Sequence, residues 1–406
     1  MSTAGSASAG AAPADRGGPL IFLVAGEPSG DQLGARLMAA LKAETGGPVR
    51  FAGIGGPLMA AEGLDSLFPL DELSVMGFVD VLPHIPRLLR RVREVAEAAL
   101  AARPAALVTI DSPAFTLRVA RRLAKDPRGR GIPLIHYVAP SVWAWKPWRA
   151  RRVAGYLDHL LALLPFEPAY FERHGLVVTV VGHPAVEAAT IAADGPAFRR
   201  RYGIPPDAPL VCVLPGSRRG EIARHEPVYA GALGLLKARF PDLRAVAPTV
   251  PTVADLVEAA AARWPVPAVV LRDPAEKYQA FAAADLAIAT SGTIAVELAV
   301  AGVPALIGYR VGPVTAVIGR ALLRIKYASL VNLILDRMVQ TELLQEDCTA
   351  ARFAAEAERL LRDPVVRQAQ TDGAREAAKR LGHGGEAPSR KAARAVLKVI
   401  ADKRTT

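Results

Sequence analysis

A repeated alternation of short apolar runs with stretches of helical spacing constrains the fold more than any other feature of the chain. Runs of this kind, bounded by glycine or proline and separated by amphipathic stretches, are typical of parallel strands buried between two layers of helices. They occupy residues 20–25, 106–110, 134–138, 160–164 and 177–181 in the first half and 210–214, 245–247, 268–271, 286–289 and 305–307 in the second. The sequence therefore predicts an α/β protein with two doubly wound, Rossmann-like domains.

The length also supports two domains, because 406 residues exceed the usual size of one. A polar stretch at 186–206 is typical of a linker between them. The first 18 residues are rich in Ala, Gly and Ser and lack the basic and apolar segments of a secretory signal. We predict a disordered tail at 1–18, a first domain at 19–186, a second domain at 187–365, and C-terminal helices at 366–406 that return to the first domain.

The formal net charge of +11 favours an anionic partner, such as nucleic acid, a phosphorylated metabolite or an acidic membrane surface. The aromatic residues are not interleaved with Lys and Arg as in nucleic-acid-binding modules, so we expect no nucleic acid. Cys212 and Cys348 suggest neither a disulfide framework nor a zinc site, which fits a reducing cytoplasm. The longest apolar region, 281–309, is interrupted by Asp285 and Glu297 and cannot be a spanning helix. We expect a soluble or peripheral protein.

The turn at residues 214–221 has the composition of an anion site. It follows an apolar run and precedes a helical pattern that begins near Ile222. A helix start leaves backbone N–H groups without intrahelical partners, and Arg218 and Arg219 add two guanidinium groups. A diphosphate is the ligand that this combination predicts, and an ordinary basic surface turn is the alternative.

A second turn in the same half, residues 290–293, opens another helix and offers further free N–H groups. Glu297 lies one turn into that helix. If the helix faces a cleft, this carboxylate can accept hydrogen bonds from a ribose diol. The alternative is a solvated glutamate that supports the first turn.

The first half contains two glycine-rich loops, at 26–31 and 53–57. The second of these loops follows another short predicted strand, but neither loop matches the dinucleotide-binding fingerprint. Asp111 ends the run at 106–110. Open α/β sheets bind ligands at the carboxyl ends of their strands, so Asp111 is a candidate functional carboxylate. Its alternative role is to cap the next helix.

Two other loops in the first half carry candidate contacts. Trp143, Trp145 and Trp148 fall within six positions, where they could wall a sugar or acyl site or fill a core beneath the loop. His183, after the run at 177–181, could contact a ligand or be structural.

Residues 74–95 combine an apolar stripe with several arginines. Such a helix can lie in a membrane interface, with its apolar face among acyl chains and its cations near phosphates. The alternative is an ordinary amphipathic helix packed on the sheet.

Several motifs together resemble the lipid-A-disaccharide synthase family, in order from about Leu20 to Cys348. The two-domain pattern is also similar to the GT-B architecture of glycosyltransferases, whose two domains face a cleft. The motifs are Gly26-Glu27-Pro28-Ser29-Gly30-Asp31, Ser74-Val75-Met76-Gly77, His136-Tyr137-Val138-Ala139-Pro140-Ser141-Val142-Trp143-Ala144-Trp145, Leu163-Leu164-Pro165-Phe166-Glu167, Leu214-Pro215-Gly216-Ser217-Arg218 and Glu342-Leu343-Leu344-Gln345-Glu346.

The resemblance implies an inverting hexosyltransferase that needs no metal or cofactor. Its substrates would be UDP-2,3-diacylglucosamine and 2,3-diacylglucosamine 1-phosphate, joined through the acceptor 6-hydroxyl in a β-1,6 linkage with release of UDP. An inverting displacement needs a base near the acceptor and charge stabilisation at the leaving group. The acylated substrates imply a cytoplasmic protein held peripherally at the inner membrane. The helical tail is compatible with packing on its own first domain or on a second copy in a homodimer.

The resemblance also assigns roles to residues. Asp111 matches the proposed base. Ala114 replaces a second carboxylate that the family usually has, and Thr116 replaces an Asn, so Asp111 stands alone. The donor-side candidates are Gly216, Ser217, Arg218, Ser291, Gly292, Thr293, Glu297, Asn332 and Gln345. The acceptor-side candidates are Glu27, Ser29, Asp31, Met76 and Trp143. The membrane-contact candidates are Val79, Val81, Leu82, Ile85, Leu88 and Leu89.

Two other functions remain open from the sequence. A UDP-sugar 2-epimerase would use the same architecture and similar nucleotide turns without an acyl site. A nucleotide-sugar-binding protein that has lost catalysis is compatible with the missing second carboxylate at Ala114.

Overall fold

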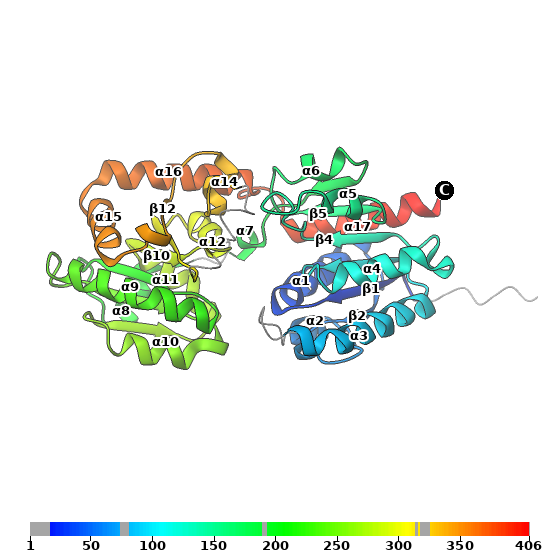
Figure 1. Cartoon of the computed structure of the whole chain (residues 1–406), viewed down its shortest axis with the longest axis horizontal. Helices are drawn as coiled ribbons and strands as arrows, with labels where there is room; N and C mark the ends of the chain where they lie inside the picture. Colours follow the sequence, from blue (N-terminus) through cyan, green and yellow to red (C-terminus); the bar gives the residue numbers. More distant parts are fainter. Residues whose placement is uncertain (1–16, 74–80, 189–192, 313–315, 317–324, 406) are drawn as a thin grey trace, which may run out of the picture. The chain divides into compact units, whose positions relative to one another are not determined.

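Two six-stranded sheets organise the chain, and their strand pairs are parallel (Figure 1). The computed structural model describes residues 17–73, 81–188, 193–312, 316 and 325–405, without the side chains of 81–85 and 404. The first sheet has the order β2-β1-β3-β4-β5-β6 and the second has the order β12-β11-β10-β7-β8-β9. This topology confirms the predicted α/β class with two doubly wound sheets.

The strands follow the apolar runs closely. The first sheet contains β1 (Leu20–Ala25), β2 (Arg50–Ile54), β3 (Ala106–Ile110), β4 (Leu134–Tyr137), β5 (His159–Ala162) and β6 (Val177–Val180). The second contains β7 (Leu210–Leu214), β8 (Arg244–Pro248), β9 (Ala268–Leu271), β10 (Leu286–Thr290), β11 (Ala305–Tyr309) and β12 (Thr341–Leu344). Every residue of β3, β7 and β10 is buried, which explains their uninterrupted apolar character.

One strand escaped prediction. The segment β12 pairs only with β11 at the edge of its sheet, and most of its residues are half-buried. An edge strand with one polar and one partly covered face has no continuous apolar run, so hydrophobicity alone does not reveal it.

The chain divides into two compact units. One comprises Met1–Val138, Gly155–Leu161 and Ala392–Thr406, and the other comprises Ala139–Ala154 and Ala162–Lys391. The helices used below are α1 (Pro28–Thr45), α2 (Pro57–Ala61), α3 (Val81–Ala102), α4 (Thr116–Lys125), α8 (Gly195–Arg201), α9 (Arg219–Lys237), α10 (Ala254–Ala261), α11 (Lys277–Ala283), α12 (Ile294–Val300), α14 (Leu330–Leu335), α15 (Ala350–Arg362), α16 (Pro364–Arg380) and α17 (Pro388–Arg404).

Close strand contact in the first unit depends on a glycine. Gly53 pairs with Leu23 of the neighbouring strand and has a φ of +132°. A Cβ at this position would lie 1.9 Å from the Leu23 carbonyl oxygen. Only glycine fits both the backbone conformation and the space.

Helices cover both faces of the second sheet, so this unit has two cores. Along β7, Val211 and Val213 join the core beneath α9, α10 and α15, whereas Leu210, Cys212 and Leu214 join the core beneath α8, α11 and α12. This alternation follows from the two-residue period of a strand. Cys212 is therefore a buried packing residue.

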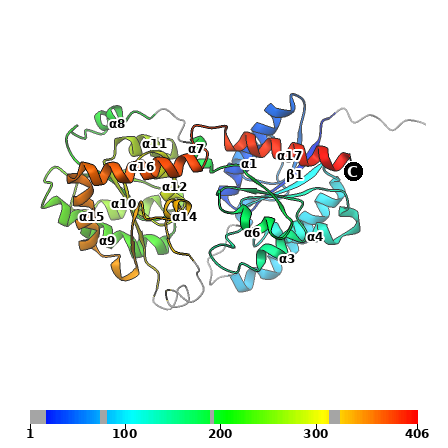
Figure 2. The ribbon, with the colours of Figure 1, turned by 90° about the horizontal axis from the view of Figure 1, so that it is seen from above.

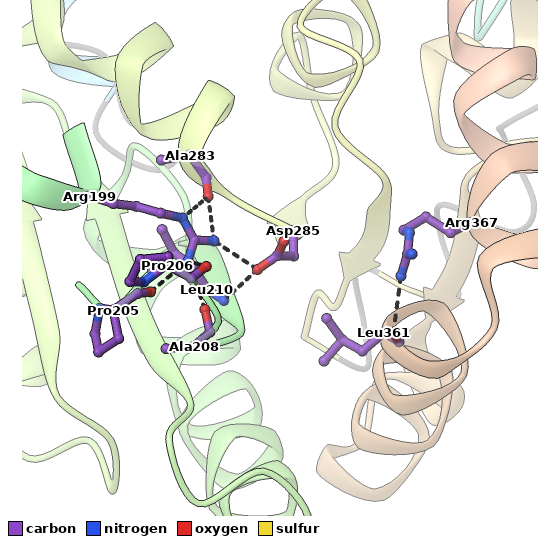
Figure 3. Close-up of polar contacts among 9 residues, drawn as sticks. All are labelled: Arg199, Pro205, Pro206, Ala208, Leu210, Ala283, Asp285, Leu361 and Arg367. Atoms are coloured by element: carbon purple, nitrogen blue, oxygen red, sulfur yellow. Dashed lines mark hydrogen bonds and ion pairs between the residues drawn. The ribbon is translucent and has the colours of Figure 1, made fainter. Parts of the chain in front are cut away.

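Arg199 of α8 connects three backbone segments (Figure 3). Its guanidinium donates to the carbonyl oxygens of Ala283 at 2.8 Å and Ala208 at 2.8 Å, and it pairs with Asp285 at 2.9 Å. The Asp285 carboxylate also accepts the Leu210 N–H at 2.8 Å. The stretch predicted as a linker thus contains a helix fixed to α11 and to the start of β7.

The C-terminal helices divide between the two units. Helix α16 packs against α12 and α14 in the second unit (Figure 2). In α17, Arg394 pairs with Glu44 and Lys403 pairs with Asp158, both at 2.8 Å. Only the end of the tail therefore belongs to the first unit. The predicted domain boundaries stay a prediction.

Candidate functional site

A cavity of about 430 Å³ lies at the carboxyl edge of the second sheet. This is the edge where parallel α/β sheets place their ligands. The cavity is lined by Leu214, Gly216, Ser217, Arg218, Glu221, Pro248, Thr249, Val250, Asp273, Pro274, Lys277, Thr290, Ser291, Gly292, Thr293, Ile294 and Glu297. The structure thus brings together the two turns that the sequence analysis singled out separately.

The first turn is held in shape by a carboxylate from its own helix. Gly216 has a φ of +126°, and a Cβ there would lie 2.5 Å from the Glu221 Cβ. The Ser217 N–H donates to Glu221 Oε2 at 3.0 Å, and Arg218 pairs with Glu221 Oε1 at 3.1 Å. The Arg218 side chain remains 79% exposed, so this ion pair is weak and can exchange for a ligand.

The second turn links β10 to α12. The Ser291 N–H donates to the Gly308 carbonyl oxygen at 2.9 Å, and the Ser291 hydroxyl donates to the Ala328 carbonyl oxygen at 2.8 Å. A Cβ on Gly292 would meet no atom within 4 Å. The turn is therefore anchored at Ser291 and open at Gly292.

Glu297, the candidate for a ribose contact, pairs with Lys277 at the start of α11. Both residues line the cavity. Sequence reasoning missed Lys277 because nothing in the chain near Glu297 points to it. Lys277 follows β9 on the same sheet edge as the two turns. This position in the predicted strand order could have indicated that Lys277 lies near the site.

The charges around the cavity are compensated. Its lining contains the cations Arg218 and Lys277 and the carboxylates Glu221, Asp273 and Glu297. The cavity that the basic turn helps to form thus has no surplus of positive charge. Binding of an anion would depend on backbone N–H groups and on cations that exchange their carboxylate partners.

Asn332 and Gln345, also predicted on the donor side, do not line this cavity. Asn332 is buried, and its amide bonds the backbone of Val339 and Gln340 and the carboxylate of Glu342. Glu342 in turn accepts the Ala328 N–H at 2.8 Å, next to the carbonyl that holds Ser291. Asn332 therefore supports the second turn indirectly.

Gln345 lies just beyond β12 and has a φ of +49°. Its Oε1 accepts the Val311 N–H at 3.4 Å, a long hydrogen bond. The observed role of this side chain is to connect the segment that follows β12 to the segment that follows β11.

Asp111 occupies a strained turn at the end of β3 in the first unit. Asp111 and Ser112 have φ values of +51° and +42°, a region that non-glycine residues seldom adopt. Asp111 Oδ2 accepts the Ser29 hydroxyl at 2.9 Å, and Oδ1 accepts the Ser112 N–H at 2.8 Å. The N-cap of α4 is Phe115, so the alternative in which Asp111 caps this helix is wrong.

The two departures from the family pattern have different surroundings. Thr116 is buried, and its hydroxyl donates to the Asp111 carbonyl oxygen at 2.5 Å. It therefore supports the strained turn. Ala114 is exposed in the same loop.

The remaining acceptor-side candidates differ in role. Asp31 is buried and accepts the N–H groups of Gly56, Leu58 and Met59, so it fixes the start of α2. The observed role of Asp31 is therefore structural, and its contact with the acceptor stays a prediction. Glu27 is exposed at the N-cap of α1, and Met76 lies outside the described residues.

Trp143 belongs to the second unit and is half-buried. Its ring packs edge-on against the Phe166 ring, with the two ring centroids 5.4 Å apart. The Trp143 ring N–H donates to the Glu167 carboxylate at 3.4 Å. Burial raises the pKa of Glu167 to about 7, although the N–H groups of Leu163 and Leu164 oppose that rise. Sequence reasoning quoted this glutamate in a motif and gave it no role.

Trp145 and Trp148 do not share the surroundings of Trp143. The Lys146 ammonium lies 4.2 Å from the centroid of the Trp145 ring, and Trp148 is exposed. His183 is buried, its Nδ1 accepts the Ala185 N–H at 3.2 Å, and burial lowers its pKa to about 4. The structural role considered for His183 is the one observed.

Of the six residues predicted to contact the membrane, the structure describes the side chains of two, Leu88 and Leu89. Val79 lies outside the described residues, as do the side chains of Val81, Leu82 and Ile85. Leu88 is 8% exposed and Leu89 is 41% exposed. Leu88 is therefore a core residue and its predicted membrane contact is wrong, because the helix turns this side chain inward.

The arginines of α3 also divide by position. Arg87 and Arg91 both pair with Glu72, at 2.9 and 2.6 Å, and the Arg91 guanidinium lies over the Phe68 ring. Arg90 and Arg93 are exposed. None of the described helices has the length and apolar character required to cross a bilayer.

The two parallel six-stranded sheets define a class of fold, the GT-B fold, which solved structures of low sequence identity share with this chain. The chain is similar to a putative UDP-N-acetylglucosamine 2-epimerase from Listeria monocytogenes (TM-score 0.63, 14% identity, 95% of this chain and 97% of that one). It is similar to the S. aureus MnaA–UDP co-structure (0.65, 12%, 96% and 98%) and to the glycotransferase of kitacinnamycin (0.59, 16%, 94% and 99%). At these identities the likeness concerns the fold alone.

Sequence comparison identifies the family within that class. The family model described as lipid-A-disaccharide synthetase matches residues 21–397. The lipid-A-disaccharide synthase of Rhodospirillum centenum is 54% identical over 381 residues, covering 94% of each chain, and that of Paramagnetospirillum magneticum is 53% identical over 383 residues, covering 94% of this chain and 97% of the relative. The chain belongs to the lipid-A-disaccharide synthetase family and is a glycosyltransferase of lipid A biosynthesis.

Proposed function

We propose that this protein transfers 2,3-diacylglucosamine from UDP-2,3-diacylglucosamine to the 6-hydroxyl of 2,3-diacylglucosamine 1-phosphate, with inversion, and releases UDP. The observation that carries the proposal is the cavity of the second unit, where both predicted turns meet Glu297 and Lys277. Membership of the family supports the same reaction and disfavours the epimerase alternative, which has only a likeness of fold.

On the donor side, the diphosphate of UDP is proposed to bind at Ser217, Arg218 and the turn at 291–293. Arg218 is exposed and weakly paired, so it can give up Glu221 for a phosphate with more charge. As the bond from the anomeric carbon to the diphosphate oxygen breaks, its electron pair stays on UDP. Arg218 and the turn N–H groups would stabilise that developing charge.

On the acceptor side, Asp111 is proposed to take the proton of the 6-hydroxyl as this oxygen attacks the anomeric carbon. A carboxylate can act as general base if it lies within hydrogen-bond reach of the attacking hydroxyl. The bond from Ser29 supports this role, because it fixes the carboxylate while leaving it partly exposed. The strained backbone at 111–112 is of the kind often found at active sites.

The acylated substrates lead to a proposal of peripheral attachment to the cytoplasmic face of the inner membrane. Among the described side chains of α3, the exposed Leu89, Arg90 and Arg93 could contact lipid. A homodimer formed through the C-terminal helices is a further part of this proposal. Size-exclusion chromatography with light scattering would test it.

The reaction is tested by incubating the purified protein with both acylated substrates and analysing the products by mass spectrometry. We expect a disaccharide 1-phosphate and a stoichiometric amount of UDP. An epimerised UDP-sugar, or binding of the donor without a product, would contradict the proposal.

A further inference from the structure

An ion pair within the cavity wall joins Lys277 to Glu297. Lys277 begins α11 and Glu297 lies in the first turn of α12, so the pair connects two helices that follow different strands. The two side chains are 29% and 18% exposed. The pair is therefore more sheltered than the Arg218–Glu221 pair in the same cavity.

The sheltered atom is the carboxylate oxygen that faces lysine. Glu297 Oε2 is shielded from solvent, and within the described part of the chain it has no hydrogen bond besides its ion pair with Lys277. A buried carboxylate oxygen that loses its cation would be strongly destabilised. Lys277 therefore holds Glu297 in one orientation through Oε2, and Oε1 is the oxygen left to accept a hydrogen bond from a ligand.

The polarity of the cavity indicates which part of a ligand meets this oxygen. A carboxylate repels phosphate and accepts hydrogen bonds from hydroxyl groups. The turn at Ser217 and Arg218 suits the phosphates, so Glu297 suits a sugar diol. We propose that Lys277 is a positioning residue, which holds Glu297 against the ribose and thereby makes the cavity selective for ribonucleotides over 2′-deoxyribonucleotides. This inference rests on the proposed binding of a UDP-sugar.

A direct role for Lys277 predicts a different result. If the Lys277 ammonium bound the diphosphate itself, removal of the ammonium would weaken the binding of UDP and of 2′-deoxy-UDP by the same factor. If Lys277 acts through Glu297, removal of the ammonium should weaken the binding of UDP more than that of 2′-deoxy-UDP. The two affinities should then become similar. The ratio of the two dissociation constants separates the roles.

The test is calorimetric titration of UDP and 2′-deoxy-UDP into the full chain and its variants. We expect the unmodified protein to prefer UDP by at least about tenfold, the worth of one hydrogen bond to a charged group. Lys277→Met should reduce that preference to about twofold or less, and Lys277→Arg should restore most of it. The matched control is Lys326→Met, which removes an exposed lysine paired with Asp336 in the same unit and should leave the ratio unchanged.

A second comparison covers the case in which Lys277→Met does not fold. The double variant Lys277→Met/Glu297→Gln removes both charges and leaves no unpaired carboxylate. Acting through Glu297, Lys277 should add nothing to the change in ratio produced by Glu297→Gln alone. A further change in the double variant would overturn the inference.

The remaining outcomes separate this inference from the function on which it rests. Failure of the unmodified protein to bind UDP would remove the proposed function itself. Binding of UDP and 2′-deoxy-UDP with equal affinity, or an equal loss of both in Lys277→Met, would leave that function standing and show the positioning role to be wrong.

Discussion

The hydroxyl of Ser29 donates to Oδ2 of Asp111 across 2.9 Å, joining the start of α1 to the end of β3. The two residues are far apart in sequence, and each follows a parallel strand of the first sheet. This hydrogen bond fixes the carboxylate proposed as general base.

The bond leads to a prediction about turnover. Asp111→Asn should lower kcat by about 10²- to 10⁴-fold, because an amide cannot take the proton of the acceptor hydroxyl. Ser29→Ala should lower kcat by roughly tenfold through loss of orientation. Steady-state kinetics of both single variants and the double variant, with UDP affinity as control, would measure these effects. If Ser29→Ala lowered kcat by the same factor in the unmodified protein and in the Asp111→Asn variant, Ser29 would not act through Asp111.

Arg218 is predicted to contact the leaving diphosphate. Arg218→Met should weaken UDP binding by about 10- to 100-fold, the usual value of a charge-assisted hydrogen bond. Arg219→Met is the matched control, because the neighbouring arginine does not line the cavity. Calorimetric titration with UDP would compare the two variants. Similar losses in both would mean that only the general charge of the turn matters.

Arg199 is predicted to matter for stability. Arg199→Met removes the donors that hold Ala208, Ala283 and Asp285 together, and it leaves buried carbonyl oxygens without partners. The free energy of unfolding should fall by about 2–4 kcal/mol. Urea denaturation would measure it, with the exposed Arg200→Met as control. A loss below about 0.5 kcal/mol would show that water replaces these bonds.

Two buried groups should give stability opposite dependences on pH. The pKa of Glu167 is raised from 4.5 to about 7, so the folded chain keeps a proton that the unfolded chain loses. The contribution of Glu167 to the free energy of unfolding is full below pH 4.5 and is lost as the pH rises to 7. The pKa of His183 is lowered from 6.5 to about 4, so its contribution is full above pH 6.5 and is lost as pH falls. Each contribution is on the order of 3 kcal/mol.

Between pH 5 and 7 the two groups change the free energy of unfolding in opposite directions as the pH changes. Single variants should therefore reveal the pH dependence that each group contributes. In Glu167→Gln the free energy of unfolding should fall more steeply from pH 7 to pH 5 than in the unmodified protein. In His183→Asn it should rise over the same interval. Urea denaturation at several pH values would test both, and identical profiles for all three proteins would exclude these two groups as the cause.

Leu89 is predicted to contact lipid. Leu89→Glu should weaken co-sedimentation with anionic phospholipid vesicles several-fold, because it places a carboxylate at an apolar and anionic surface. Leu235→Glu, on an exposed position of α9, is the control. Unchanged sedimentation of Leu89→Glu, with an unchanged melting temperature, would assign α3 to the fold alone.

Much of the fold follows from local sequence. The strands at 106–110 and 210–214 could be predicted to the residue, because a strand buried on both faces is a continuous apolar run. The turns at 214–221 and 290–293 could be predicted as helix starts for a similar reason, since Gly216 and the residues that follow it have conformations set by nearby chain. Family membership was also readable from the order of short motifs.

The partners of charged side chains could not be predicted in this way. Arg218 looked like a free cation, yet it pairs with Glu221, and Glu297 pairs with a lysine from another helix. Leu88 and Leu89 are adjacent in the same apolar stripe, yet one is buried and the other is exposed. Asp31 and Asp111 both follow glycine-rich or apolar runs, yet only Asp111 keeps a partly exposed carboxylate.

The sequence by itself determined the buried strands, the helix starts at the two turns and the family, because each depends on residues within a few positions of one another. Only the tertiary structure decided which side chains meet at the cavity and which serve the fold. The reason is that parallel strands bring distant loops to one edge of a sheet, and the contacts made there depend on packing between helices that local sequence does not encode.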